Sequence, residues 1–265
     1  MSLTLGTGPF GQHPAGRFNV DVPRKGVLYV EELPRWVRVR FAGETVADAR
    51  RPRLVHEHAR LPFFAFAEED VRADLLQPTG RTESDEVKGE RELISVAVGD
   101  RTADAAAARY RDGVLAGLHS FDWDAMDEWL EEDEVLVGHA QDPYSRIDVR
   151  PTSRHVRILL DGEVLAETRR GKVLFEAGLP PRWYFPQEDV RMELLETSDG
   201  RSTCAYKGHA SYWSVGDEDD LVWTYREPLH DALPVKDMLA FFNERVDIEV
   251  DGELEERPRT QWSRD

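Results

Sequence analysis

Two long stretches of the chain begin with the alternation of apolar and polar residues that is typical of a half-buried strand. Val37 and Val39 alternate with arginines, and Val156 and Ile158 follow a similar pattern in the second stretch. Successive side chains of a strand point to opposite faces of a sheet, so a period of two predicts one buried and one exposed face. Further apolar segments predict strands over residues 164–167, 173–175, 206–215 and 221–225. The chain is therefore predicted to be mainly β, built from antiparallel sheets.

Short turn signals separate these strands. Asp161-Gly162 favours the positive φ angles of a tight hairpin, and Ala42-Gly43 takes the same place in the first stretch. Pro180-Pro181 predicts an extended or turned segment, because proline fixes φ and removes a hydrogen-bond donor. Pro186 and the polar residues after it predict a single helical turn with acidic groups at its positive end.

A different pattern closes each stretch. Four apolar residues recur at helical spacing, which places them on one face of a predicted short helix that packs into the core. They are Trp123, Met126, Trp129 and Leu130 in the first stretch, and Val235, Met238, Leu239 and Phe242 in the second.

The two stretches are copies of each other. Sliding the chain by 119 residues lays Val37 over Val156, and the same register continues without a gap to Lys88 over Lys207. Such self-similarity at a fixed offset is the signature of a structural repeat. The sequence therefore predicts two tandem domains of one fold.

The copies define the expected domain boundaries. Residues 1–24 are rich in glycine and proline, so they are expected to form an arm lying on a domain. The first domain is expected over residues 25–145 and the second over 146–255, and residues 256–265 form a charged tail.

The charge balance limits the partners. The 265-residue chain has 34 Lys and Arg against 52 Asp and Glu, a formal net charge of −18, which opposes binding to nucleic acid or to anionic lipid. No apolar run reaches the roughly 20 residues of a membrane helix, and the first residues lack the pattern of a signal peptide. We expect a cytoplasmic protein that is a monomer or a weak homo-oligomer.

A lone cysteine limits the covalent and metal chemistry. Cys204 has no second cysteine with which to form an internal disulfide or a cysteine-based zinc site. His56 and His58 have the spacing of a strand, but no third ligand lies at a diagnostic distance in the sequence. No metal ion and no other cofactor are expected.

Candidate chemistry is concentrated in the second copy. Cys204, Lys207 and His209 are close in sequence, and positive charge near a thiol favours the nucleophilic thiolate. Cys204 is a candidate nucleophile or redox centre, with Lys207 or His209 lowering its pKa and Arg191 holding an anionic substrate. The alternative for Cys204 is a buried structural cysteine beside a core aromatic residue. The lysine that the first copy keeps as Lys88 suggests a structural ion-pair network.

Aromatic residues gather around the same segments. Such rings line pockets for flat or cationic ligands, and they also fill ordinary β cores. The set comprises Trp183, Tyr184, Phe185, Tyr212, Trp213, Trp223 and Tyr225. The residues expected to bind a ligand are Tyr184, Arg191, Tyr206, Tyr212, Trp213 and Trp223.

The first copy has lost the thiol and most of these rings. Asp85 stands at the position of Cys204, and Ile94 stands at the position of Trp213. A site that needs the thiol and the aromatic rings therefore belongs to the second copy.

These residues carry a resemblance to the family known as domain of unknown function 427. Its motif looks like Tyr-Phe-Pro-x-Glu-Asp-Val-Arg, then Cys-Pro-Tyr-Lys-Gly-x-Ala-x-Tyr-Trp and a later Trp-x-Tyr. Residues 184–191 match the first segment, residues 204–213 match the second with Ala205 in place of its proline, and Trp223 and Tyr225 match the last. The first copy keeps Glu69-Asp70-Val71-Arg72 and Lys88-Gly89.

The resemblance implies two tandem domains similar to the β-tent fold, in which two antiparallel sheets meet at an angle over a shared core. A nucleotidyltransferase label is sometimes attached to the family, but this chain has neither a phosphate loop nor paired catalytic carboxylates. The leading hypothesis is a small-molecule ligand in an aromatic-lined pocket of the second domain. The alternatives are a cysteine-dependent redox or transferase enzyme and a non-catalytic protein-interaction or structural module. The sequence leaves open whether a reaction is catalysed.

Overall fold

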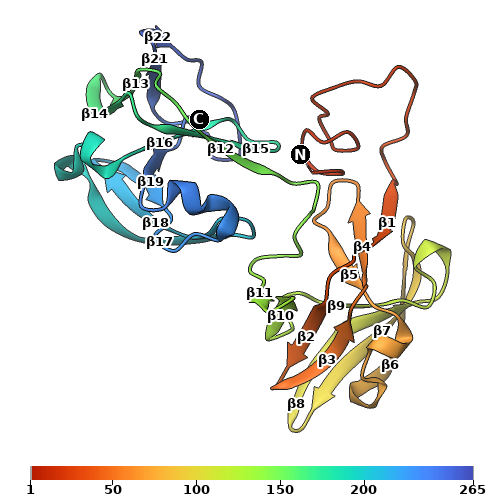
Figure 1. The fold of residues 1–265 in the computed structure, drawn as a ribbon. Coiled ribbons are helices and arrows are strands. Elements are labelled where there is room, and N and C mark those ends of the chain that lie inside the picture. Colours follow the sequence, from red (N-terminus) through yellow and green to blue (C-terminus); the bar gives the residue numbers. More distant parts are fainter. Residues whose placement is uncertain (1, 265) are drawn as a thin grey trace. The chain divides into compact units, whose positions relative to one another are not determined.

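The structure, a computed structural model, describes residues 2–264, and these fall into two compact units, residues 2–142 and 143–264. Every strand pairing within the sheets is antiparallel (Figure 1). The prediction of a mainly β fold of antiparallel sheets is confirmed.

The first unit has three sheets. The three-stranded sheet has the order β1-β4-β5, one four-stranded sheet has the order β11-β10-β2-β3, and the other has the order β6-β7-β8-β9. The strands are β1 (Leu28–Glu32), β2 (Val37–Phe41), β3 (Glu44–Ala49), β4 (Arg53–Glu57), β5 (Phe63–Ala65), β6 (Leu76–Asp85), β7 (Gly89–Val98), β8 (Arg101–Tyr110), β9 (His119–Phe121), β10 (Glu128–Glu131) and β11 (Glu134–Val135). Three short 3-10 helices are η1 (Glu68–Asp70), η2 (Ala73–Leu75) and η3 (Gly113–Leu115).

The second unit has two sheets. A seven-stranded sheet has the order β12-β15-β16-β20-β19-β18-β17, and a four-stranded sheet has the order β14-β13-β21-β22. The strands are β12 (Ile147–Pro151), β13 (Val156–Leu160), β14 (Glu163–Thr168), β15 (Lys172–Glu176), β16 (Arg182–Phe185), β17 (Glu196–Cys204), β18 (Gly208–Val215), β19 (Glu218–Thr224), β20 (Leu239–Phe241), β21 (Asp247–Val250) and β22 (Glu253–Leu254). The 3-10 helices are η4 (Gln187–Asp189), η5 (Met192–Leu194) and η6 (His230–Val235).

Both units have one topology. A single bridge between Phe66 and His119 links β5 to β9, so the order β1-β4-β5-β9-β8-β7-β6 corresponds strand for strand to the seven-stranded sheet of the second unit. The remaining four strands of each unit also correspond. The repeat read from the sequence is therefore a repeat of structure.

The two predicted hairpin turns are confirmed. Asp161 and Gly162 have φ angles of 50° and 83°, and Ala42 and Gly43 have φ angles of 51° and 84°. Positive φ at both central residues matches the right-handed twist of the flanking strands. The helical turn predicted after Pro186 is η4.

The stripes at helical spacing do not form α-helices. In the first unit, Trp129 and Leu130 belong to β10, and the ring of Trp123 stacks on that of Trp129 from the preceding turn, with centroids 4.7 Å apart. In the second unit the short helix η6 ends at Val235, and Leu239 belongs to β20. The apolar residues recur every three or four positions because residues of a turn and of a strand pack into the same core. The same spacing is found along one face of a helix.

Each unit has a core on both faces of its long sheet. In the second unit the inner cluster lies between the two sheets and includes Phe185, Trp213 and Phe241. An outer cluster lies on the opposite face of the seven-stranded sheet and includes Tyr184 and Trp223. The corresponding outer cluster of the first unit has four buried members, Val55, Ala65, Tyr110 and Leu115.

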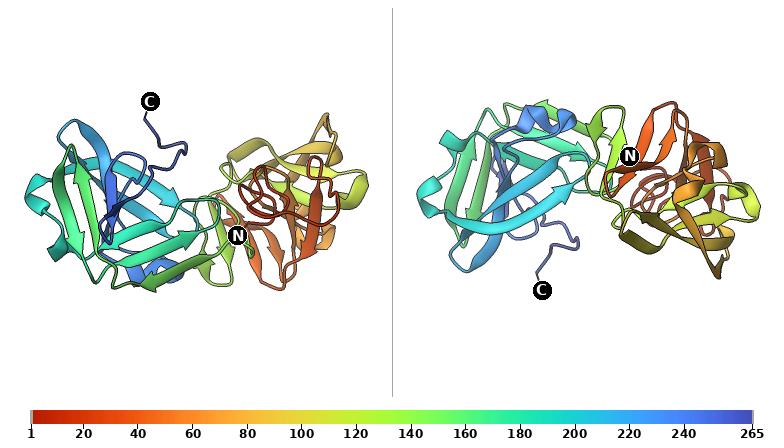
Figure 2. Two further views of the ribbon diagram at one scale, coloured as in Figure 1. Left: turned by 90° about the horizontal axis from the view of Figure 1, so that it is seen from above. Right: turned by 90° about the horizontal axis from the view of Figure 1, so that it is seen from below.

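The first and the last described segments each contact one unit. The backbone N–H of Ala59 donates to the carbonyl of Thr4, and the hydroxyl of Ser2 donates to Asp142 at 2.6 Å, so the first residues lie on the first unit. After β22 the described residues 255–264 form a tail without strands or helices (Figure 2). The Thr260 hydroxyl donates to Glu244 at 2.7 Å, and the ring of Trp262 lies 5.9 Å from that of Phe242.

Candidate functional site

The first motif segment places its charged residues in surface ion pairs of the second unit. Asp189 accepts hydrogen bonds from Thr168 at 2.7 Å and from the guanidinium of Arg170. These bonds, with Arg170 first, lower the pKa of Asp189 against the opposing effect of its partial burial. Arg191 donates to Glu163 at 2.7 Å and to Glu193 at 3.0 Å.

Arg191 therefore already has two carboxylate partners. Arg72, at the same place in the first unit, pairs with Asp74 at 2.7 Å and approaches Glu44 at 3.9 Å. Since both units repeat the arrangement, these contacts explain the arginine without a substrate. Its proposed contact with an anionic ligand stays a prediction.

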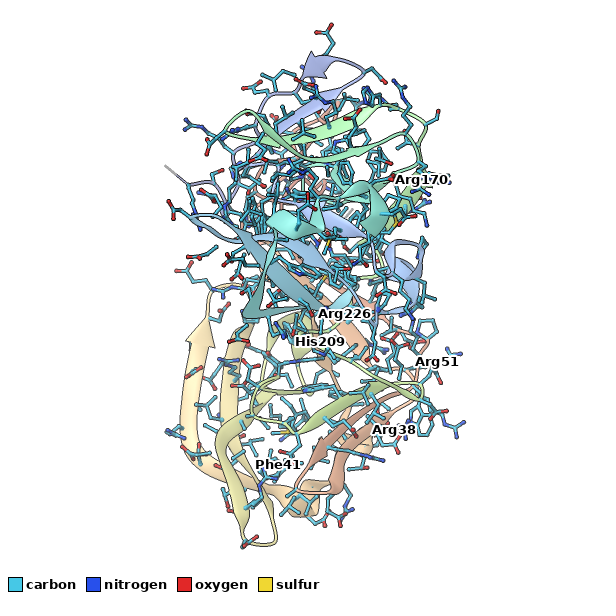
Figure 3. All side chains as sticks on the ribbon, turned by 90° about the vertical axis from the view of Figure 1, so that its left-hand side faces the viewer. Arg38, Phe41, Arg51, Arg170, His209 and Arg226 are labelled. Atoms are coloured by element: carbon cyan, nitrogen blue, oxygen red, sulfur yellow. The ribbon has the colours of Figure 1, made fainter. Side chains whose placement is uncertain are left out.

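The second motif segment forms the end of the β17–β18 hairpin. Cys204 is half-buried and pairs with Gly208 across the ladder. His209 follows on β18 with an exposed side chain, and its Nδ1 lies 2.9 Å from the Thr203 hydroxyl (Figure 3). Tyr206 is half-buried in the turn between the two strands.

Lys207 is a buried lysine held by a carboxylate. Its ammonium forms an ion pair with Glu176 of β15, and both side chains are about nine-tenths buried. In the first unit Lys88 and Glu57 form the same pair at 2.7 Å. The lysine that both copies retain therefore joins the hairpin to β15 in the second unit and to β4 in the first, strands that are not adjacent to the hairpin in the strand order.

Three tyrosines of the second unit have raised phenol pKa values, and burial is the first cause for each: Tyr184, Tyr212 and Tyr225. Burial raises the pKa of Tyr184 and Tyr225 well above the usual range, so both phenols are neutral. The thiol-nucleophile hypothesis for Cys204 stays a prediction.

The aromatic residues form a row across the outer face of the seven-stranded sheet. Strand register places Tyr212 opposite Trp223, Trp223 opposite Ala240, and Ala240 opposite Tyr184. Directly opposite residues of a sheet share a face. Nε1 of Trp223 donates a hydrogen bond of 3.2 Å to the Tyr184 hydroxyl across the small Ala240. Tyr184 and Trp223 are buried, and Trp213 lies in the inner cluster on the opposite face.

Arg182 lies on the same strand as Tyr184, at the start of β16, and sequence reasoning missed it. Its guanidinium makes two hydrogen bonds to Glu244, of 2.7 and 2.8 Å, and both side chains are almost fully buried. The rings of Trp223, Phe242 and Trp262 lie 5.6, 5.8 and 5.6 Å from its central carbon. A charged residue in the otherwise apolar run Arg182–Phe185 was the signal for this buried charge.

A cleft opens on the other face of the same strands. Side chains of β15 and β16 alternate, so Trp183 points away from Tyr184 and toward the four-stranded sheet, where it joins the inner cluster. Trp183 and Phe175 line a cleft of about 550 Å³. Its remaining lining residues are Arg150, Pro151, Thr152, Arg154, Val173, Pro180, Pro181, Asn243, Glu255, Glu256 and Pro258.

Hydrogen bonds hold the walls of this cleft in place. Asn243 donates through Nδ2 to the carbonyl of Pro181 at 2.9 Å, and the Glu255 N–H donates to Ile248 at 2.8 Å. Arg154 is oriented by Asp251, whose Oδ2 lies 2.9 Å from Nε, and its guanidinium lies 5.6 Å from the centre of the Trp183 ring. The cleft is therefore preformed, with an aromatic floor and a cation beside it.

A comparison with protein families matches the chain twice, over residues 29–132 and 148–252, to the model described as domain of unknown function (DUF427). The two matches together cover more than half of the chain, and each falls within one structural unit. The protein belongs to the DUF427 family. It is a tandem DUF427 protein, as the resemblance in its motifs implied. No curated protein matches the chain.

Within residues 2–264, no helix has the length and apolar character needed to cross a membrane. Over the same residues, no three side chains among His, Cys, Asp and Glu converge as metal ligands.

Proposed function

We propose that the protein binds a small molecule in the aromatic-lined cleft of its second domain. The observation that carries the proposal is the cleft of about 550 Å³ with Trp183 and Phe175 in its lining. Sites for small molecules are usually preformed concavities of about 300–1,000 Å³ that are mostly apolar, with a few fixed polar groups. Of the aromatic residues singled out in the sequence, Trp183 is the one that lines this cleft.

The lining favours a planar ring. Four prolines, Pro151, Pro180, Pro181 and Pro258, contribute rigid apolar walls around the two aromatic side chains. Phe175 is 45% exposed, so a ligand that covers it would bury apolar surface that water now contacts.

Two arginines of the lining, beside Glu255 and Glu256 of the tail, favour an acidic or hydrogen-bond-accepting substituent on that ring. Arg154 lies beside Trp183 and keeps donors free, because its contact with Asp251 uses Nε. Arg150 lies on the edge strand β12 and contacts Asp148 through one terminal nitrogen at 2.9 Å. A guanidinium has five N–H donors in a fixed plane, so each arginine can bind a carboxylate as well as its own partner.

A ligand-observed NMR screen with planar aromatic carboxylic acids tests the proposal on the full chain. For the tightest hit, titration calorimetry compares the native protein with Phe175→Ser and Arg154→Gln. We expect each substitution to weaken binding about tenfold, the effect of about 1.4 kcal/mol of lost stacking or charge-assisted hydrogen bonding.

Leu233→Ser is the matched control. Leu233 lies on η6 of the same domain, is 56% exposed and does not line the cleft. Its substitution should leave the affinity unchanged. Equal affinity of the native protein and both cleft variants would refute binding at this cleft.

A further inference from the structure

The first domain contains a cavity of its own, at a place that is filled in the second domain. This cavity of about 630 Å³ lies against the outer face of the sheet β6-β7-β8-β9. Its lining residues are Glu57, Arg60, Leu61, Phe63, Arg81, Glu83, Asp85, Lys88, Arg91, Leu93, Ala105, Ala106, Ala107, Ala108, Tyr110, Ser120, Phe121 and Asp122.

Strand register shows why the cavity exists. Leu93 pairs with Ala108, and Ala108 pairs with Ser120, whereas the second domain has Tyr212, Trp223 and Ala240 at these places. Ala105 and Asp220 both have a φ of 51°, which supports this alignment of β8 with β19. Two large rings of the outer row are thus replaced by smaller side chains in the first domain.

A third ring is replaced by a charged group. The N–H of Asp122 donates to Ala106, and the N–H of Phe242 donates to Leu221, so Asp122 and Phe242 occupy equivalent places. Interiors are normally close-packed, and voids larger than a water molecule are few. The first domain has Leu, Ala and Asp where the second domain has three aromatic rings. It therefore has an open volume where the second domain has a packed core.

The walls of the cavity carry mixed charge. Four cationic side chains, Arg60, Arg81, Lys88 and Arg91, face it together with four carboxylates, Glu57, Glu83, Asp85 and Asp122, so its formal charge is zero in a chain of net charge −18. The ammonium of Lys88 forms ion pairs with Glu57 at 2.7 Å and with Asp85 at 3.1 Å. These three groups of the cavity wall are therefore already paired with one another.

The charges nearer the solvent are the ones available to a ligand. Arg81 contacts Asp104 at 2.9 Å, and its side chain is 54% exposed; Arg91 contacts Glu83 at 2.7 Å, and the Glu83 side chain is 52% exposed. Between the charges lies a floor that includes the aliphatic side chains of Leu93 and Ala108. An anion such as phosphate would meet four carboxylates, and an apolar ligand would strip water from the charged walls.

We propose that this cavity binds a zwitterion of amino-acid or short-peptide size. The carboxylate of the ligand contacts the guanidinium of Arg81, its ammonium contacts Glu83 or Asp122, and its side chain lies over Leu93 and Ala108. Guanidinium and carboxylate groups form the stronger, charge-assisted hydrogen bonds. The site is separate from the cleft of the second domain.

The probes are the standard amino acids and their dipeptides at millimolar concentration, together with N-acetylated and amidated forms that lack one charge. Thermal unfolding of the full chain identifies the probes that bind, because saturating ligand raises the midpoint by mass action. Calorimetry then measures their affinity. We expect at least one zwitterion to bind, and its acetylated or amidated form to bind at least tenfold more weakly.

The decisive variant is Leu93→Tyr combined with Asp122→Phe, which restores two rings of the second domain and fills the cavity. Binding should fall at least tenfold. Arg81→Gln should weaken it severalfold without affecting folding, and Arg101→Gln is the control, because Arg101 is 52% exposed and pairs with Asp127 outside the cavity. The proposal is overturned if no zwitterion of the panel binds, or if filling the cavity and removing Arg81 both leave the affinity unchanged.

Discussion

Ala108 of the first domain and Trp223 of the second occupy the same position in the repeated fold. Ala108 pairs with Leu93 on the adjacent strand, and Trp223 pairs with Tyr212. Trp223 is 7% exposed, and its ring contacts Phe242 at a centroid distance of 4.7 Å. Ala108 leaves this volume open. One fold thus has a packed outer face in its second copy and a cavity in its first.

Trp223→Ala should therefore destabilise the second domain strongly. Truncating a buried tryptophan costs about 3–5 kcal/mol, because transfer free energy is lost and a cavity remains. It also removes the hydrogen bond to Tyr184. Urea unfolding measures the effect, with the half-exposed Phe175→Ser as control. A loss below about 1 kcal/mol would show that Trp223 is not part of a packed core.

His119→Leu should stabilise the first domain, most of all at mildly acidic pH. His119 is 5% exposed, and its Nδ1 has no hydrogen-bond partner within residues 2–264. Burial, and then the nearby Arg109, lower its pKa. The unfolded chain therefore binds a proton more readily, so stability is lost as the pH falls below the unfolded value of about 6.5. The second domain has Leu239 at this position.

The measurement is the unfolding midpoint of both proteins between about pH 8 and pH 5, where histidine titrates. The gain of the leucine variant should grow as the pH falls. A constant difference across this range would mean that His119 does not titrate with folding.

Lys207→Met should cost about 3–5 kcal/mol, since it leaves the carboxylate of Glu176 buried without its partner. Adding Glu176→Leu should restore most of the loss. Lys172→Met is the control, because its ammonium contacts the carbonyl of Pro234 at an exposed place. Chemical denaturation gives the values. If the single variant is no less stable than the control, the buried pair does not join the hairpin to the sheet.

Asp85→Asn should destabilise the first domain at neutral pH and much less in acid. The backbone N–H of Lys88 donates a hydrogen bond to the Asp85 carboxylate, and this bond is the main reason that the pKa of Asp85 is lowered to about 2. Partial burial opposes the shift, and a second hydrogen bond from the Val87 N–H adds to it. The pKa of Asp in an unfolded chain is about 3.9. The stabilisation is thus complete above about pH 4 and is lost as the pH falls toward 2. Urea midpoints at several pH values measure it, and an effect that persists undiminished to the lowest pH would contradict the assignment.

The repeat, the hairpins and the mainly β class could be read from the sequence because they depend on local signals. Asp161-Gly162 encodes its turn in two adjacent residues, and the offset between the copies survives without a gap as far as Gly208. The helical stripes failed because Trp123 and Trp129 reach one core from a turn and a strand. Spacing along the chain does not distinguish that case from a helix.

The site was harder to predict because it depends on contacts distant in sequence. The sequence placed the aromatic residues around one predicted pocket, but alternation along β16 sends Trp183 and Tyr184 to opposite faces of the sheet. The cleft of the second domain also needs the tail residues Glu255 and Pro258, which no motif contains. In the first domain, the alanines of β8 became a sign of a cavity once strand register set Ala108 against Trp223.

The most direct test of the central proposal is a crystal structure of the full chain with the tightest planar acid bound. We expect electron density for the ring against Trp183 and Phe175, with its acidic group within hydrogen-bond distance of Arg154. Density for this ligand at any other place, with the cleft empty, would contradict the proposal.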